Sequence, residues 1–172
     1  MFNKKRTIVV ASLFATFIAF SSVEAKVVKI GVVDLGYIVQ NSDKGKKAKK
    51  YIEAETKKEQ QIIQNKEKGL QALIQDISSK SFLLDKDLKR AKAEEAQNMK
   101  KDLERYFQDS KEKIQKKQSK LMEQILKDLR DVINTYGEKE GFTLIVEKAS
   151  PYYFDSSVEI TQKILESYNN KK

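Results

Sequence analysis

The sequence predicts an α+β protein in which a long antiparallel helical hairpin projects from a small body of three short strands and two short helices. Residues 46–136 form a lysine-rich, strongly charged stretch with no proline and one glycine. In a helix interior Gly costs about 1 kcal/mol and Pro about 3, so their near absence favours uninterrupted helix. Short segments typical of β-strands flank this stretch on both sides. The helical hairpin therefore makes up most of the predicted molecule.

Residues 1–25 have the pattern of a secretory signal peptide. A basic segment at residues 4–6 precedes an uncharged, mostly apolar run at residues 8–20, and small residues lead to Ala25. The apolar run is shorter than the roughly 20 residues that a membrane span needs. We therefore expect cleavage between Ala25 and Lys26, and a soluble exported protein after the leader is removed.

Composition excludes most catalytic classes. The leader accounts for three of the 34 basic and one of the 25 acidic residues, so 31 and 24 remain and the mature net charge is +7. The chain has no His, Cys or Trp, which removes the common proton shuttle, the thiolate nucleophile and the best metal ligands. No phosphate loop of the GK[ST] type follows its glycines. We expect no enzyme, cofactor or metal site.

The predicted body combines residues 26–42 with residues 141–172. The first strand lies within 27–34 and the second within 142–147, and alternate residues of a strand share one face. Pro151 opens a third extended piece, and a capping-box pattern at Ser156 and Glu159 precedes a final helix. The expected apolar core residues of the assembled body are Val28, Ile30, Val32, Phe142, Leu144 and Val146.

The small size of the body favours oligomerisation. Its two segments total 49 residues, which is near the size where one core is marginal without disulfides, metals or partner subunits. Because the chain has no Cys, disulfides are excluded. We therefore expect the body to share apolar surface with other copies.

The predicted arm covers residues 43–140. Residues 41–43 offer N-cap candidates for its first helix, and the pattern breaks for a turn near 78–85, where Asp85 can start the second helix. Gly137 and Gly141 are candidate C-caps. Apolar residues recur mostly three or four apart, which is coiled-coil spacing, but the seam is incompletely filled.

Apolar residues of the arm often occur as adjacent pairs. Neighbouring helical residues point about 100° apart, so one member can pack against the sister helix while the other widens the apolar stripe. A simple two-helix seam would not need an apolar stripe of that width. Near the base there is an alternative explanation, since both residues of a pair would be buried where several arms meet. The apolar doublets are Tyr51-Ile52, Ile62-Ile63, Leu73-Ile74, Tyr106-Phe107, Leu121-Met122, Ile125-Leu126 and Val132-Ile133.

At this point the sequence resembles the Skp or OmpH family of periplasmic chaperones over residues 26–172. The resemblance rests on the leader, on KIGVVD followed by LGYIVQNSDKGKKA, on the helical insertion, on GFTLIVEK and on the tail YYFDSSVEITQKIL. It implies a homotrimer whose strands form a small β-barrel body, with three helical hairpins extending as tentacles around a cavity. It also implies that unfolded outer-membrane proteins are held there in the periplasm without ATP.

Three functions remain open from the sequence. A holdase needs exposed apolar side chains on the distal arm, whereas a structural tether of the envelope needs a narrow, filled seam. A polyanion-binding protein would act through lysines alone; export disfavours nucleic acid, while anionic lipid or lipopolysaccharide stays open. The lysine clusters are by default the solvated face of a coiled coil. The candidate client-binding residues are Leu73, Ile77, Met99, Phe107, Lys100, Lys101, Lys116 and Lys117.

Overall fold

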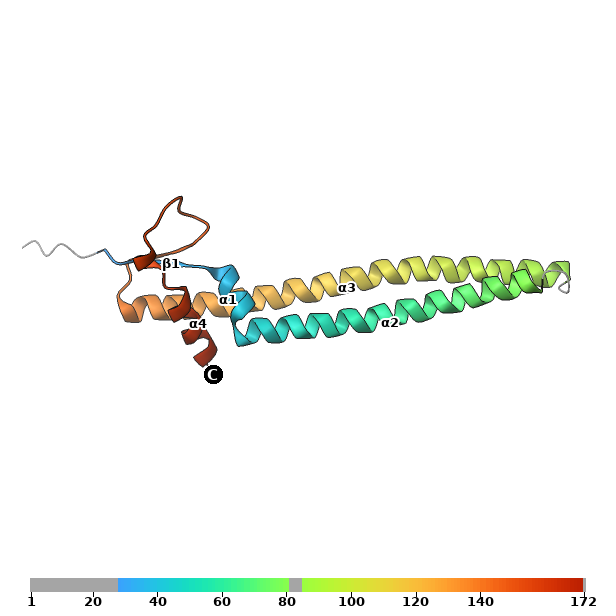
Figure 1. Cartoon of the computed structure of the whole chain (residues 1–172), viewed down its shortest axis with the longest axis horizontal. Helices are drawn as coiled ribbons and strands as arrows, with labels where there is room; N and C mark the ends of the chain where they lie inside the picture. The colour runs from blue at the N-terminus through green and yellow to red at the C-terminus, as the bar shows by residue number, and fades with distance from the viewer. Residues whose placement is uncertain (1–27, 81–84, 172) are drawn as a thin grey trace, which may run out of the picture.

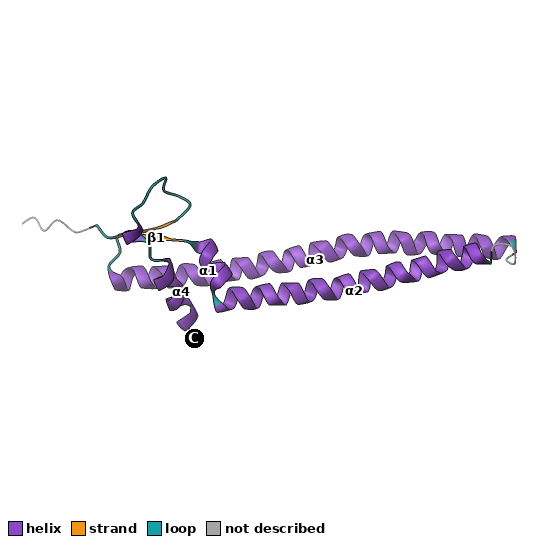
Figure 2. Ribbon diagram, viewed as in Figure 1, coloured by secondary structure: helices purple, strands orange, loops and turns teal. Residues whose placement is uncertain are grey.

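A computed structural model describes residues 28–80 and 85–171, so the predicted cleavage site at Ala25 and Lys26 lies outside the described residues. Long helices dominate these residues, and a small sheet pairs the segment before the long helices with the segment that follows them (Figure 2). The elements in order are β1 (Ile30–Val33), α1 (Leu35–Asn41), α2 (Asp43–Ser79), α3 (Lys86–Glu140), β2 (Leu144–Glu147), the 3-10 turn η1 (Ser156–Val158) and α4 (Thr161–Asn170).

The two long helices form an arm that extends far beyond the body. α2 and α3 run antiparallel side by side, and the remaining elements gather around the base of α3 (Figure 1). At 1.5 Å per residue, the 37 residues of α2 and the 55 of α3 span about 55 and 80 Å. The additional length of α3 carries it past the start of α2 and into the body.

Capping groups end the arm helices where the sequence suggested. The side chain of Ser42 accepts a hydrogen bond from the Gly45 N–H at 3.1 Å, which caps α2. Asp85 accepts from the Leu88 N–H at 2.8 Å and caps α3. Gly141 ends α3 with a left-handed φ of 71°. Gly137, the other predicted C-cap, instead lies buried inside α3.

The described residues of the body form two strands, not the three that we expected. β1 and β2 pair in parallel, with Ile30 opposite Leu144 and Val32 opposite Val146. Residues 152–154, the expected third strand, have no regular secondary structure. The chain returns to the sheet only through an isolated bridge between Val32 and Glu159. A barrel is therefore not formed by the described residues of one chain.

The capping box predicted for the last helix is also absent. Asp155 caps the 3-10 turn by accepting from the Ser157 N–H at 2.8 Å. Glu159 instead accepts from Lys148 at 3.0 Å, and α4 begins without a side-chain cap. The 3-10 turn takes up the residues that the capping box would have used.

One apolar core fastens the arm to the body. It forms where the base of α3 meets α1, α4 and β1, and its members are almost fully buried. Tyr168, Leu129, Ile164 and Ile38 are among the largest of these side chains. Fully burying one such side chain stabilises a fold by about 1.5–3 kcal/mol. The buried core residues are Val33, Ile38, Ile125, Leu129, Val132, Ile160, Ile164 and Tyr168.

A close backbone contact at the corner between α1 and α2 requires glycine. A Cβ on Gly45 would lie 1.6 Å from the Val39 carbonyl oxygen, which is a backbone atom. A Cβ on Gly69, in the middle of α2, would meet only the end of Met99 at 3.5 Å, an ordinary contact. These two glycines of one helix therefore differ sharply in what they tolerate.

We predict opposite effects for the two alanine substitutions. Gly45→Ala should lower the free energy of unfolding by about 1–3 kcal/mol or more, because the corner must open. Gly69→Ala should raise it by about 0.4–1 kcal/mol, because alanine restricts the unfolded chain without strain. Thermal unfolding followed by circular dichroism measures both. Equal stability of Gly45→Ala and the parent protein would contradict the tight corner.

Candidate functional site

The six residues expected in the core of the assembled body lie in different environments. Val32 is buried, whereas Val28, Ile30 and Leu144 are 62 %, 43 % and 52 % exposed. Val146 is half-buried. The pairing of Ile30 with Leu144 places two exposed apolar side chains side by side on the sheet. A patch of apolar surface is thus left uncovered by the described residues of the chain.

Phe142 does not share the face of Leu144 and Val146, contrary to our expectation. Its N–H donates to the Gly137 carbonyl at 2.9 Å, so it belongs to the turn that ends α3 and precedes β2. Its ring packs against the buried core, with its centroid 6.0 Å from that of Tyr136. Lys29 Nζ lies 4.2 Å from the centroid of the same ring. The alternation of a strand does not extend to this residue.

The eight candidate client-binding residues are distributed along the arm and do not form one site. Leu73 and Ile77 lie on the distal part of α2, and Met99 lies near Gly69 on the facing part of α3. These three apolar side chains are half-buried. Phe107 is further toward the base and is 50 % exposed. The structure therefore provides a long surface rather than a single pocket.

Three of the four candidate lysines face solvent, and the fourth does not. Lys100, Lys101 and Lys116 are exposed. Lys117 is paired across the arm with Glu55, and it also donates to the Tyr51 hydroxyl at 3.1 Å. We therefore reassign Lys117 from a free surface cation to a structural residue of the arm.

The apolar doublets divide as their 100° spacing predicted. In five of the seven pairs one residue is exposed while its neighbour is buried or half-buried, and this arrangement recurs from one end of the arm to the other. The most exposed members are Phe107 and Ile74, both at 50 %. The exposed members of these pairs are Tyr51, Ile74, Phe107, Met122 and Leu126.

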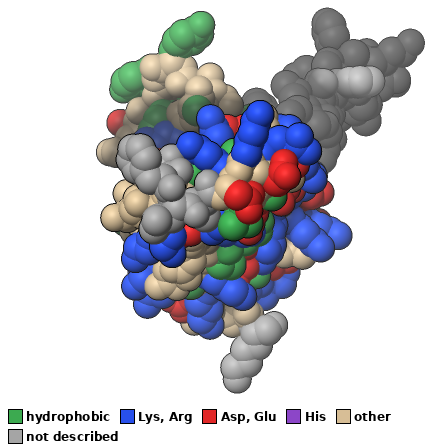
Figure 3. Space-filling model, turned by 90° about the vertical axis from the view of Figure 1, so that its right-hand side faces the viewer, with side chains coloured by type: hydrophobic (Ala, Val, Ile, Leu, Met, Phe, Trp, Pro, Cys, Tyr) green, Lys and Arg blue, Asp and Glu red, His purple; other side chains and the backbone are tan. Residues whose placement is uncertain are grey.

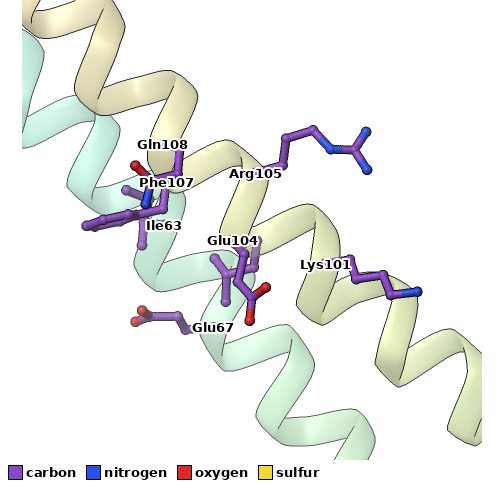
Figure 4. Close-up of a pocket in the computed structure, with 8 residues that line it drawn as sticks. Ile63, Glu67, Lys101, Glu104, Arg105, Phe107 and Gln108 are labelled. Atoms are coloured by element: carbon purple, nitrogen blue, oxygen red, sulfur yellow. The ribbon is translucent and has the colours of Figure 1, made fainter.

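A groove surrounds Phe107 in the middle of the arm (Figure 4). Ile63 of α2 lies beside the Phe107 ring, and Leu103 adds a third apolar side chain. Lys101 and Arg105 point away from α2 on the outer side of α3. The groove has a volume of about 820 Å³ and is completed by Glu67, Glu104 and Gln108. An open apolar floor with charged edges suits an extended, partly apolar polypeptide better than a compact ligand.

Lysine and arginine side chains cover much of the arm surface. Viewed along the arm from its distal end, they surround smaller apolar and acidic areas (Figure 3). Several of them pair with acidic residues of the same helix, for example Lys116 with Glu112 at 3.5 Å. Exposed pairs of this kind contribute little to stability. Their main effect is to give the arm a solvated, net basic surface.

The inner side of the arm is polar at its centre, which the sequence analysis missed. Glu59 is only 5 % exposed and accepts hydrogen bonds from Tyr106 at 2.7 Å, Ser110 at 3.0 Å and Lys113 at 2.7 Å. These donors, Lys113 first, lower the pKa of Glu59 from 4.5 to about 2. The sequence did hold a signal for this contact. Glu55 and Glu59 are four residues apart, and Lys113 and Lys117 have the same spacing.

A second cross-helix contact lies nearer the tip. Asp76 of α2 binds Lys92 of α3 at 2.6 Å, and it also binds Lys80, the residue that follows α2, at 2.6 Å. The two ammonium groups, Lys80 first, lower the pKa of Asp76 to about 2. Together with the Glu59 contacts, this pair shows that polar bonds supplement a thin apolar seam.

The described residues contain neither a metal-binding cluster nor a membrane-spanning helix. In residues 28–80 and 85–171, no three His, Cys, Asp or Glu side chains are grouped to hold an ion. Within the same ranges, no helix is both long and apolar enough to cross a membrane.

Comparisons with known proteins agree on one family. The family model for outer membrane protein (OmpH-like) matches residues 29–168. The chaperone protein Skp of Photorhabdus luminescens is 26 % identical over 162 residues, covering 90 % of this chain and 94 % of that protein. An uncharacterized protein of Aquifex aeolicus is 25 % identical over 133 residues, covering 77 % and 81 %.

A solved structure has the same fold at low sequence identity. The crystal structure of an OmpH-like protein from Caulobacter crescentus CB15 superposes with a TM-score of 0.80, although only 11 % of residues are identical. The match covers 84 % of this chain and 86 % of the other. The family match and the shared fold cover the arm and the body together, and the chain belongs to the Skp/OmpH family.

Proposed function

We propose that this protein is an ATP-independent periplasmic holdase that binds unfolded outer-membrane proteins and prevents their aggregation. The observation that carries the proposal is the repeated exposure of one member of the apolar doublets along the arm. Membership of the Skp/OmpH family supports the chaperone class. In this proposal residues 1–25 are the signal peptide, residues 26–42 and 141–172 form the body, and residues 43–140 form the arm.

A long surface of separate apolar side chains suits unfolded outer-membrane strands. Such strands alternate apolar and polar residues, so no single deep pocket fits all of them. Side chains such as Ile74 and Phe107 offer weak, repeated contacts on different parts of the arm. Exposed lysines can attract acidic segments from a distance without fixing one geometry. A tether would need a filled seam, and the exposed doublet members are unnecessary for that role.

We expect the exposed apolar side chains of the arm to contribute more to client affinity than its exposed charges. Phe107→Ser combined with Ile74→Ser should weaken binding of a denatured outer-membrane β-barrel protein about tenfold or more at every salt concentration, because apolar burial is lost. Leu73 and Met99 are less suitable, since they are half-buried and their loss would also weaken the seam. Gln75→Ser with Asn98→Ser changes one exposed position on each arm helix outside the groove and is the matched control.

The lysines should act mainly on the rate of capture. Changing Lys100, Lys101 and Lys116 to Gln should slow capture at low salt and have little effect at physiological salt, where charges are screened beyond about 8 Å. Stopped-flow mixing with a fluorescent client measures this rate. If the lysine changes abolished binding at physiological salt while the apolar changes did nothing, the arm would be an electrostatic trap, as for anionic lipid or lipopolysaccharide.

We further propose that three copies assemble through the body into a closed sheet or barrel. The exposed apolar side chains of Val28, Ile30 and Leu144 support this assembly. No strand within the described residues pairs with the outer edge of β2. Tyr152 and Tyr153 are also highly exposed on the segment that follows. Open strand edges and exposed apolar residues are features that a partner subunit would cover.

Introducing a charge on this patch should prevent assembly. Ile30→Asp would bury an unpaired carboxylate in the interface at a cost of several kcal/mol, so the mature protein should dissociate or unfold. Analytical ultracentrifugation gives the mass, and circular dichroism reports whether the helices persist. Asn134→Asp adds the same charge at an exposed position of α3 and should stay trimeric. A fully trimeric, soluble Ile30→Asp protein would place the interface elsewhere.

A further inference from the structure

Two acidic and two basic residues form a paired contact at the centre of the arm. Glu59 of α2 binds Lys113 of α3 at 2.7 Å, and one turn away Glu55 binds Lys117. We call these four residues the mid-arm clamp. Glu59 also receives hydrogen bonds from the Tyr106 and Ser110 hydroxyls, and Lys117 donates to the Tyr51 hydroxyl. The Glu59 carboxylate is thus bonded at both oxygens by α3, and the Glu55 carboxylate at one.

The clamp lies in the part of the arm where no apolar side chain is fully buried in the seam. Among the described residues of α2 beyond Gly45, Glu59 is the only buried side chain. Among those of α3 before Ile125, Ser110 is the only buried side chain. Both belong to the same hydrogen-bonded group. Half-buried apolar side chains are tolerant of sliding, whereas a buried carboxylate requires its particular partners.

Of the registers within one turn of the observed one, only the observed one satisfies every bond of the clamp. Sliding the helices by one turn in one direction would set Glu59 against Lys117, but Glu55 would then face Leu121. Sliding them the other way would set Glu55 against Lys113, but Glu59 would then face Asp109. A slip of three residues would set Glu59 against Lys116 and Glu55 against Lys120, but Asp109 and Lys113 would then replace the hydroxyls of Tyr106 and Ser110 beside Glu59. A four-residue slip leaves one carboxylate without its lysine, and the three-residue slip takes both hydroxyl donors from the buried Glu59, so each slip is unfavourable.

We propose that the mid-arm clamp of Glu55, Glu59, Lys113 and Lys117 fixes the register of the arm. A single buried polar residue is known to specify register in coiled coils at some expense of stability, and the clamp acts by the same physical principle. The competing determinant of the register is the N-cap at Asp85, which sets where α3 begins. The clamp role concerns arm geometry and does not depend on client binding.

A distance measurement between spin labels tests the register directly. The chain has no Cys, so labels attach only at introduced cysteines. Gln71→Cys on α2 and Gln97→Cys on α3 are exposed positions on the distal side of the clamp. The labelled mature chain is refolded with a large excess of unlabelled chain, so that each assembly carries at most one labelled copy. Pulsed electron paramagnetic resonance then reports the distance distribution between the labels within one arm.

The clamp variant is Glu59→Ala with Lys113→Ala, and alanine favours helix at both positions. The parent protein should give one narrow distribution. The clamp variant should add distances from slipped arms, in which the helices are displaced by about 6 Å along the axis, four residues at 1.5 Å each. Glu112→Ala with Lys116→Ala removes the same residue types from an exposed pair within α3 and should stay narrow.

The outcomes separate clearly. A narrow, unshifted distribution for the clamp variant would overturn the proposal and assign the register to the turn at Asp85. Equal broadening of the clamp variant and its control would also overturn it, because overall charge would then decide. If the alanine variant lost helical circular dichroism, the same measurement on Glu59→Leu with Lys113→Leu decides, since leucines fill the seam without ionic selectivity.

Discussion

Two helices packed against each other share a single seam, and two adjacent residues on one helix cannot both point into it. This constraint determines the surface of the arm. In most apolar doublets of the arm one residue remains outside, as Tyr106 and Phe107 illustrate, whereas Ile62 and Ile63 are both half-buried. Burying both would require a third layer, which is present only at the base, where α1 and α4 cover α3. The exposed surface therefore follows from the architecture.

The base and the arm use different means of stabilisation. At the base, Ile125, Leu129 and Val132 are buried in a continuous apolar core with α1 and α4. Toward the tip, the described seam relies on half-buried apolar side chains and on ion pairs such as Lys92 with Asp76. Regions with few buried apolar contacts open at lower free energy than a packed core. In the proposed holdase, such an arm would adapt to clients of different size while its base stays fixed.

The long helices and their ends could be predicted because their signals are local. The absence of proline, the N-caps Ser42 and Asp85 and the left-handed Gly141 all act within a few residues of the chain. Pairing of strands is not local. The prediction of a third strand was wrong because an extended sequence forms a strand only beside a partner. The position of Phe142 was wrong for a related reason, since α3 extends to Glu140 and its terminal turn includes that residue.

The candidate site was predicted only in part, since Phe107 is exposed as expected but Leu73, Ile77 and Met99 are half-buried. Helix geometry predicts that adjacent residues point in different directions, but it does not say which of the two faces outward, and the exposed member of the Leu73-Ile74 pair is Ile74. The burial of Glu59 and the pairing of Lys117 depend on which turn of α2 faces which turn of α3. A sequence read along one helix does not contain that register. The lysines therefore could not be sorted into surface and seam residues beforehand.

The most direct test of the holdase account is site-specific photo-cross-linking to a client. A benzophenone amino acid replaces Phe107 on the arm or, in a second protein, Tyr37, which is exposed on α1 of the body. Each protein is irradiated with a denatured outer-membrane β-barrel protein and, as a control, with the same protein after folding. The account predicts strong cross-links from position 107 to the denatured client, weak ones from position 37 and none to the folded barrel. Strong cross-links from position 37 with none from position 107 would contradict it.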